Sequence, residues 1–79
     1  MSFQVLFFGE LADICGVAKF EYFGDTPCTV KQFRKELLVE FPVLSGYGFS
    51  VAASYSYMNE EDILESGIEV ALIPPVGGG

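Results

Sequence analysis

The sequence contains no histidine, which is the side chain most often used to move protons near neutral pH. It also has no pair of carboxylates at a meaningful catalytic spacing, no phosphate-binding loop and no cluster of metal ligands. The acidic run Glu60-Glu61-Asp62 lacks the spacing of a calcium loop and is interpreted as a solvated bend. We therefore expect neither internal catalytic machinery nor a metal site, nor any bound cofactor.

Basic residues are also scarce. Four lysines and arginines stand against eleven aspartates and glutamates, which gives a net charge of −7. This balance argues against nucleic acid as a partner. It fits docking onto a basic protein surface, where complementary charge speeds the encounter. The alternative is that the charge only keeps an apolar chain soluble.

Only two cysteines are present, Cys15 and Cys28, and they do not form a Cys-x-x-Cys motif. A small secreted domain held by disulfides usually carries more. The sequence shows no signal peptide and no apolar run long enough to cross a membrane. We expect a cytoplasmic protein whose cysteines are packing residues, although the position of Cys28 before a helix start is one that can lower a thiol pKa.

The composition is that of one small folded domain. The 79 residues are 51% hydrophobic and 15% aromatic, which is too apolar for a disordered chain. A domain of this length buries only about 60% of its unfolded surface, so its stability is marginal without a partner. We expect a single domain over residues 1–79 that ends in a tail over residues 74–79.

Local patterns predict the helices and strands. Thr29 and Gln32 have the spacing of a capping box at the start of the main helix, and Pro42 ends that helix. The charged side of this helix, which includes Arg34, is interpreted as a solvated face. Its apolar stripe comprises Val30, Phe33, Leu37, Leu38 and Phe41. The expected strands span residues 3–8, 19–23, 49–54, 57–58 and 68–73, and the expected short helix spans 10–14 and ends at Gly16; residues 25–28 and 43–48 are expected loops, 55–56 a turn, and 59–64 an acidic bend leading into a helical turn.

This order predicts an α+β fold with a mixed sheet of about five strands and the main helix across one face. The first and last strands are the most apolar, so they should lie side by side and parallel in the centre. The polar residues Gln4 and Glu69 mark the strand faces that point away from the helix.

Those outward faces nevertheless carry apolar side chains. They are Leu6, Phe8, Ala71 and Ile73, with Tyr57 joining from the edge strand. An apolar patch left bare on a sheet indicates a partner interface. The alternatives are that the acidic bend or the short helix covers it, or that these are scattered exposed residues without a role.

The end of the chain has an unusual composition. An apolar strand runs directly into Pro74-Pro75, and Val76 is followed by Gly77, Gly78 and Gly79. Two prolines stop the strand and favour an extended segment. Glycines lack side chains, so a terminal carboxylate on roughly 13 Å of extended chain can enter a narrow channel of another protein. Terminal glycines are otherwise often uninformative chain ends.

Both ends of the sequence resemble one family. The run Glu69-Val70-Ala71, followed by Pro74-Pro75-Val76 and Gly78-Gly79, resembles the carboxyl terminus of the molybdopterin synthase small subunit. Residues 5–12 with Gly16 resemble the opening strand and helix of that family. The resemblance implies the ubiquitin-like β-grasp fold. Departures from the family include Ser54, Ser66-Gly67-Ile68 and Leu72-Ile73, the last in place of an aromatic pair.

The resemblance also implies a function, that of a sulfur carrier in molybdenum cofactor biosynthesis. An activating enzyme would use ATP to adenylate Gly79, which would then become a thiocarboxylate. The large subunit of molybdopterin synthase would supply the catalytic groups and receive the sulfur for cyclic pyranopterin monophosphate. The alternatives are a carrier for another pathway such as thiamine synthesis, a ubiquitin-like protein modifier, and a β-grasp binding module without tail chemistry.

Overall fold

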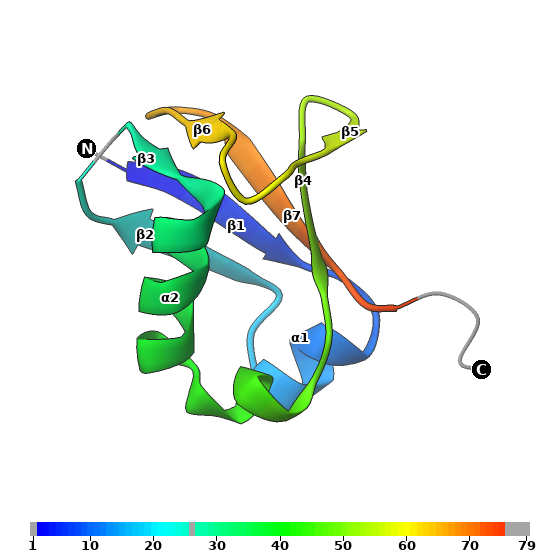
Figure 1. The fold of residues 1–79 in the computed structure, drawn as a ribbon. Coiled ribbons are helices and arrows are strands. Elements are labelled where there is room, and N and C mark those ends of the chain that lie inside the picture. Colours follow the sequence, from blue (N-terminus) through cyan, green and yellow to red (C-terminus); the bar gives the residue numbers. More distant parts are fainter. Residues whose placement is uncertain (1, 26, 76–79) are drawn as a thin grey trace.

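The computed structural model describes residues 2–25 and 27–75, and it contains a five-stranded sheet with one main helix packed on it (Figure 1). The strand order of this sheet is β2-β1-β7-β4-β5, and β3 and β6 form a separate two-stranded ladder. In chain order the elements are β1 (Ser2–Phe7), α1 (Glu10–Cys15), β2 (Lys19–Phe23), β3 (Cys28–Thr29), α2 (Val30–Glu40), the 3₁₀ helix η1 (Pro42–Gly46), β4 (Ser50–Ala53), β5 (Ser56–Tyr57), β6 (Ile63–Leu64) and β7 (Glu69–Ile73).

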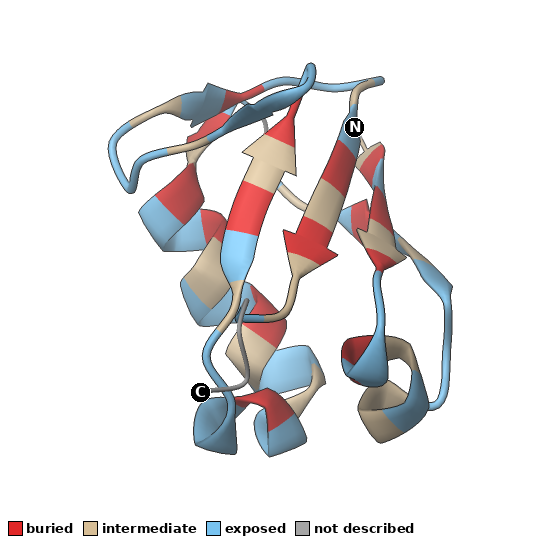
Figure 2. Cartoon of the chain, turned by 90° about the vertical axis from the view of Figure 1, so that its right-hand side faces the viewer, coloured by how far each residue is buried: buried red, intermediate tan, exposed pale blue. Residues whose placement is uncertain are grey.

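The two most apolar strands form the centre of the sheet, as predicted. β1 and β7 are parallel, with Val5 paired to Val70 and Phe7 to Leu72. These four residues face α2 and are buried. Buried and less buried residues alternate along the central strands, as Figure 2 shows. The period of two along a strand therefore separates a core face from an open face.

The main helix α2 begins at the predicted capping box. Thr29 Oγ1 accepts a hydrogen bond from the Gln32 amide at 3.1 Å, and Gln32 Oε1 accepts one from the Thr29 amide at 2.9 Å. This reciprocal pair satisfies two amide groups that the helix itself cannot. The helix ends at Glu40, immediately before Phe41 and Pro42, as expected. From the predicted apolar stripe, Val30, Phe33 and Leu37 are buried, and Leu38 and Phe41 pack against the core.

Aromatic side chains join the helix to the sheet in two groups. Phe3 of β1 and Tyr22 of β2 lie with ring centroids 4.8 Å apart, and both contact Phe33 of α2 at 5.3 Å. At the other end of the helix, Phe41 contacts Phe20 and Phe7 edge-on. Edge-to-face packing of this kind adds roughly 0.5–1.5 kcal/mol per pair beyond the burial of apolar area.

Several short elements differ from the prediction. Residues 63–64 form β6, not a helical turn, and Cys28, predicted to lie in a loop, belongs to β3. The two strands pair through Cys28↔Leu64 and Thr29↔Ile63. Two-residue strands are too short to show a period of two. Whether such a segment forms a strand therefore depends on the distant segment with which it pairs. Residues 42–46 form η1, although residues 43–48 were predicted to be a loop. Pro42 lies at the start of η1, a position at which proline is favoured.

The hairpin between β4 and β5 also differs by one residue. The turn lies at Ser54 and Tyr55, whose φ angles are +53° and +64°, and β5 is Ser56–Tyr57. Two consecutive residues with positive φ are typical of a tight hairpin that matches the twist of its strands. Serine and tyrosine rarely adopt this conformation, so the sequence carried no signal for it.

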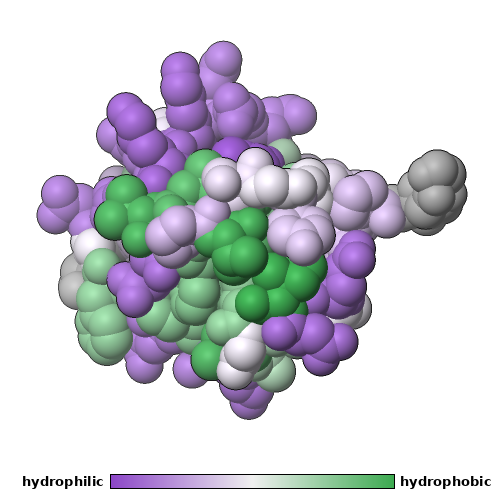
Figure 3. All heavy atoms as spheres, turned by 90° about the horizontal axis from the view of Figure 1, so that it is seen from below, coloured by the Kyte–Doolittle hydropathy of each residue, from purple (hydrophilic) through white to green (hydrophobic). Residues whose placement is uncertain are grey.

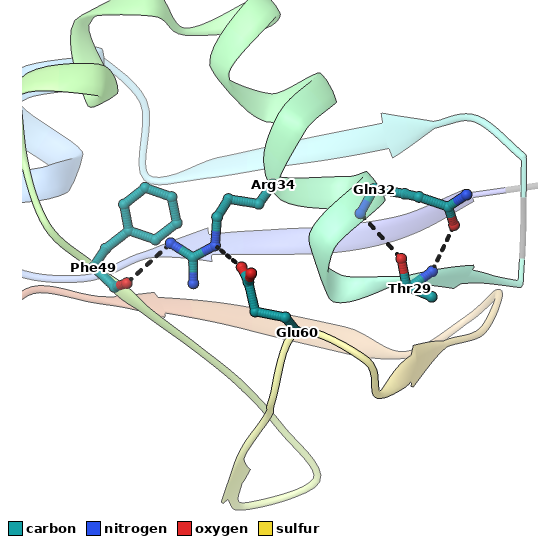
Figure 4. A network of polar contacts seen from close by, with 5 residues as sticks. All are labelled: Thr29, Gln32, Arg34, Phe49 and Glu60. Atoms are coloured by element: carbon teal, nitrogen blue, oxygen red, sulfur yellow. Dashed lines mark hydrogen bonds and ion pairs between the residues drawn. The ribbon is translucent and has the colours of Figure 1, made fainter.

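The basic side of α2 is not simply solvated. The guanidinium of Arg34 lies 4.6 Å from the ring centroid of Phe49, and its Nη1 donates to the Phe49 carbonyl at 3.2 Å. Its Nε lies 3.5 Å from Oε1 of Glu60 (Figure 4). The interpretation of Arg34 as part of a solvated face was therefore wrong, because its planar group stacks on an aromatic ring.

These contacts hold the acidic bend against the start of α2. The amides of Val30 and Lys31 donate to the carbonyls of Asp62 and Glu60, both at 3.0 Å. Arg34 adds the ion pair to Glu60. The bend is thus joined to the helix side of the domain, and it is not the element that covers the open face of the sheet.

Candidate functional site

The open face of the sheet contains a shallow apolar groove. Its lining residues come from β1, β4, β5 and β7 and from the positions that flank these strands. All five residues predicted for a partner interface lie in it: Leu6, Phe8, Tyr57, Ala71 and Ile73. Phe8 is 48% exposed and Tyr57 is 65% exposed, whereas the other three are half-buried. The structure therefore brings the five residues together, and their role in binding a partner stays a prediction.

Other lining residues of this groove were not among the predicted interface residues, although Glu69 was predicted to lie on this face. They come from the β4–β5 hairpin and from the start of β7: Ala52, Ala53, Ser54, Tyr55, Ser56, Ile68 and Glu69. Tyr55 is fully exposed at the turn. Because the sequence placed the turn one residue later, the residues that wall the groove on this side were not recognised. Glu69 is the charged residue among those that line it.

The groove ends where the chain leaves the sheet. Phe8 donates its amide hydrogen to the carbonyl of Leu72 at 3.1 Å, which keeps the end of β1 beside the end of β7. A Cβ atom on Gly9 would lie 3.1 Å from Cγ of Pro74, and Gly9 has φ +55°. Glycine tolerates both the close approach and the positive φ. Pro74 is thus seated against the turn that follows β1, next to Phe8.

The remainder of the predicted tail, Val76, Gly77, Gly78 and Gly79, lies outside the described residues. Pro74 is half-buried and Pro75 is exposed. These are the two predicted tail residues that the structure describes. They continue directly from Ala71 and Ile73, which form part of the groove.

Exposed apolar atoms are not confined to this face. Figure 3 views the molecule from the end where α1 and η1 lie, and hydrophobic atoms gather in the middle of that surface as well. Val17 and Val43 are among the exposed apolar residues elsewhere on the chain. The open face is distinguished by a groove built from four strands and by the adjoining exit of the chain.

Neither cysteine has the character of a nucleophile. Burial raises the pKa of the Cys28 thiol above its ordinary value, and the negative charges of Glu36 and Asp25 add to this effect. Burial likewise raises the pKa of Cys15. Both thiols are free and stay protonated at neutral pH. The helix start beside Cys28 does not lower its pKa, because burial and the acidic neighbours act in the opposite direction.

Within residues 2–25 and 27–75, no group of three or more cysteine, aspartate or glutamate side chains is arranged to hold a metal ion. In the same part of the chain, no helix has the length and apolar character needed to span a bilayer.

Comparison with known proteins identifies the relatives of this domain. Small archaeal modifier protein 1 from Haloferax volcanii is 25% identical, with full coverage of both chains and a TM-score of 0.84. The protein complex of subunits 1 and 2 of the molybdopterin-converting factor from Helicobacter pylori contains a chain that is 26% identical, with full coverage of both and a TM-score of 0.70. The small archaeal modifier protein 1 from Methanosarcina acetivorans, 18% identical with a TM-score of 0.79 over 99% of this chain and 96% of its own, shares the fold.

The family is shown by the sequence itself. Residues 5–79 match the pattern of the ThiS family, so the match runs from within the opening strand to the terminal glycines. The five-stranded sheet with its crossing helix matches the fold of small archaeal modifier protein 1 with a TM-score of 0.84. The chain therefore belongs to the ThiS family and has the ubiquitin-like β-grasp fold of small sulfur-carrier proteins.

Proposed function

We propose that this chain is a sulfur carrier for molybdenum cofactor biosynthesis, acting as the small subunit of a molybdopterin synthase in the cytoplasm. The observation that carries the proposal is the position of the apolar groove beside Pro74, where the chain leaves the sheet. One partner surface can bind the groove and receive the segment that follows Pro75. The likeness to a chain of the Helicobacter pylori complex of subunits 1 and 2 supports a large subunit as that partner.

The reacting group in this proposal is the terminal carboxylate of Gly79. A carboxylate reacts poorly with nucleophiles until one of its oxygens becomes a leaving group. An activating enzyme supplies this by joining the carboxylate to the α-phosphorus of ATP, with release of pyrophosphate. A sulfur nucleophile then attacks the acyl carbon, AMP leaves, and sulfur replaces one oxygen to give the thiocarboxylate.

The other tail residues have supporting roles. Gly77 and Gly78 keep the arm thin enough for the active site of the partner. Pro74, Pro75 and Val76 direct it, because proline restricts the backbone to extended conformations. Inside the large subunit, the sulfur of Gly79 attacks an oxygen-bearing carbon of cyclic pyranopterin monophosphate, and an oxygen leaves that carbon. Water then hydrolyses the acyl–sulfur bond, which frees the tail as a carboxylate and leaves the sulfur on the pterin. The acid and base groups for these steps come from the partner.

The contacts on the groove set the affinity. Phe8 and Tyr57 are the large, exposed aromatic side chains of the five predicted interface residues. Aromatic residues at the centre of an interface commonly contribute most of its binding energy. Leu6, Ala71 and Ile73 form the half-buried floor against which a partner side chain packs. The negative charge of the domain favours a partner whose rim is basic.

The test of the proposal is a two-step reconstitution. The chain is incubated with an activating enzyme, ATP and a sulfur donor, and its intact mass is measured. We expect the gain that corresponds to exchange of one oxygen for sulfur, and no gain in a variant that lacks Gly79. The charged protein is then mixed with a large subunit and cyclic pyranopterin monophosphate, and molybdopterin is measured. Failure of every activating enzyme to change the mass would refute the proposal.

A second function is favoured by the 25% identity to small archaeal modifier protein 1. In that case the activated carboxyl of Gly79 would form an isopeptide bond with a lysine of a target protein, and AMP would leave. Mass spectrometry of the products distinguishes the two functions. A branched Gly79–lysine peptide indicates a modifier, whereas a thiocarboxylate consumed by the pterin precursor indicates a carrier.

A further inference from the structure

A second groove lies at the other edge of the domain, between β2 and α2. Its apolar wall includes Phe20, Tyr22 and Leu37, and its rim carries the exposed carboxylates of Glu21, Glu36 and Glu40. Phe23, which is 72% exposed, completes it. This groove shares no lining residue with the groove on the open face. A ligand here would therefore leave Phe8, Tyr57 and the exit of the chain free.

The strand that borders this groove is at the edge of the sheet. β2 pairs with β1 on one side, and within the described residues no strand pairs with its other side. The amide of Phe7 donates to the carbonyl of Ala18 at 2.9 Å, so these two residues form a hydrogen-bonded pair. Hydrogen-bonded and non-hydrogen-bonded pairs alternate along an antiparallel ladder. By that alternation, the backbone groups of Lys19, Glu21 and Phe23 point away from β1. Such a row of unpaired amides and carbonyls is a template for an added strand.

One buried polar group faces the same region. Tyr22 is 4% exposed and lines the groove, and its hydroxyl has no hydrogen-bond partner within the described residues. The carboxylate of Glu36 is close enough to raise the pKa of this phenol, to which burial contributes most, but it does not meet hydrogen-bond geometry. A buried hydroxyl without a partner costs free energy that an incoming donor or acceptor would recover.

The charge of the groove selects the kind of ligand. Three glutamates surround an aromatic and aliphatic floor, and the chain as a whole carries −7. Lys19 is the basic residue on β2. Glu21 already accepts a hydrogen bond from Ser2 Oγ at 2.7 Å, so Glu36 and Glu40 on α2 are the carboxylates left for a ligand. Cationic side chains would pair with them, whereas an acidic ligand would be repelled.

We propose that the groove between β2 and α2 binds an extended segment of a partner protein that bears lysine or arginine and adds as a further strand along the free edge of β2. The main chain of the segment hydrogen-bonds to β2, alternate apolar side chains contact Phe20 and Leu37, and its cations pair with Glu36 and Glu40. The site is independent of the tail chemistry. A carrier held in this way can still present its carboxyl terminus to another protein.

A second copy of this chain fits the edge less well. In the two-fold antiparallel pairing centred on Glu21, the two Glu21 side chains lie directly opposite each other. Like charges in that position destabilise a strand pair. Two chains of net charge −7 also repel each other at a distance.

The experiment titrates the full isotope-labelled chain with a synthetic valine-rich peptide that has a lysine at each end, followed by NMR. We expect saturable shifts confined to residues 19–24 and 33–40, without shifts at Phe8, Tyr57 or Ile73. Two control peptides are matched to it, one ending in glutamates and one N-methylated on alternate amides. Both should bind at least about tenfold more weakly, because they lose the ion pairs or the strand hydrogen bonds.

A matched variant tests the rim. The double substitution Glu36→Gln and Glu40→Gln keeps the size of two exposed side chains and removes their charge. We expect about fivefold weaker binding of the lysine peptide and the same thiocarboxylate formation as the unmodified chain. No saturable binding, equal binding of the N-methylated peptide, or shifts on the open face would overturn the proposal. So would shifts of β2 that depend on protein concentration without peptide, which would make a second copy the ligand.

Discussion

Replacement of Tyr22 by phenylalanine is expected to stabilise the free protein. The ring of Tyr22 packs against Phe3 at 4.8 Å and Phe33 at 5.3 Å, and phenylalanine retains both contacts. The hydroxyl is buried and has no hydrogen-bond partner within the described residues. Its removal therefore relieves a desolvation cost without breaking a hydrogen bond.

The magnitude follows from the cost of an unsatisfied buried group. Such a group costs about 1–3 kcal/mol, so we expect the Tyr22→Phe variant to gain about 1 kcal/mol in the free energy of unfolding. In a domain of this size, that corresponds to a rise of about 4–8 °C in Tm. Burial and Glu36 raise the pKa of the phenol in the folded protein above its ordinary value of about 10. The stability of the unmodified protein should therefore also depend on pH above a pH of about 10. Above that pH the unfolded chain releases the phenolic proton and the folded protein retains it, so stability falls as pH rises.

Thermal and chemical denaturation of the two proteins between pH 7 and alkaline pH measure both effects. We expect the variant to be more stable than the unmodified protein at every pH. The difference in the free energy of unfolding should widen above a pH of about 10, because only the unmodified protein has the Tyr22 phenol that is deprotonated on unfolding. Cys15 and Cys28 also titrate there, but both proteins contain them, so their effect cancels. A loss of more than about 1 kcal/mol in Tyr22→Phe would refute the reasoning, because it would mean that the hydroxyl has a partner. A double-mutant cycle with Glu36→Gln would then show coupling.

The remaining predictions concern packing, docking and the tail. Gly24→Ala should lower the free energy of unfolding, measured in urea, by about 1–3 kcal/mol, because the new Cβ would lie 2.6 Å from the Tyr22 hydroxyl. Gly46→Ala, where no such neighbour lies within 4 Å of the new Cβ, should change it by less than about 0.5 kcal/mol. Equal costs of the two substitutions would contradict this prediction. Phe8→Asp should weaken binding to the large subunit at least about tenfold and leave Tm nearly unchanged, whereas Val39→Asp on the exposed side of α2 should bind normally; loss in both would refute the assignment of the groove. Deletion of Gly79 should abolish thiocarboxylate formation without lowering Tm, because the described core extends from Phe3 to Leu72; a lower Tm would show that the terminus contributes to folding.

The parts of the fold that could be predicted are those in which a local signal and the tertiary structure agree. Thr29 and Gln32 form their capping box within one helical turn, and Gly16 ends α1 in the left-handed conformation with φ +78°. The central position of β1 and β7 follows from their apolar composition, because a strand covered on one face by a helix and flanked by two others needs apolar residues. The fold class and the faces of these strands were therefore confirmed.

The parts that could not be predicted depend on contacts between distant residues. β3 and β6 exist because Cys28 pairs with Leu64, and neither dipeptide has a pattern of its own. The helical pattern indicates a surface position for Arg34, because it does not show that the guanidinium lies 4.6 Å from the ring centroid of Phe49. The groove beside β2 requires Phe20 and Glu36 to be brought together from a strand and a helix. Its residues were assigned one by one to the core or to the solvent, so no sequence pattern indicated a groove beside β2.

On the open face, the paired strands fix the point and the direction in which the chain leaves the sheet. Ala71 and Ile73 line the groove, and Pro74 follows on the same strand, seated against Gly9 at the end of β1. β7 is paired on both sides, with β1 and with β4, so it cannot shift without breaking two ladders. A partner that binds the groove therefore receives the chain from a fixed point and in a fixed direction. In this arrangement a loss of groove contacts should lower the affinity for the large subunit, but a longer linker inserted after Pro75 should lower the rate of sulfur transfer while affinity stays nearly the same. If such an insertion left the rate of transfer unchanged, the rigid placement of Pro74 and Pro75 would have no role in directing the tail.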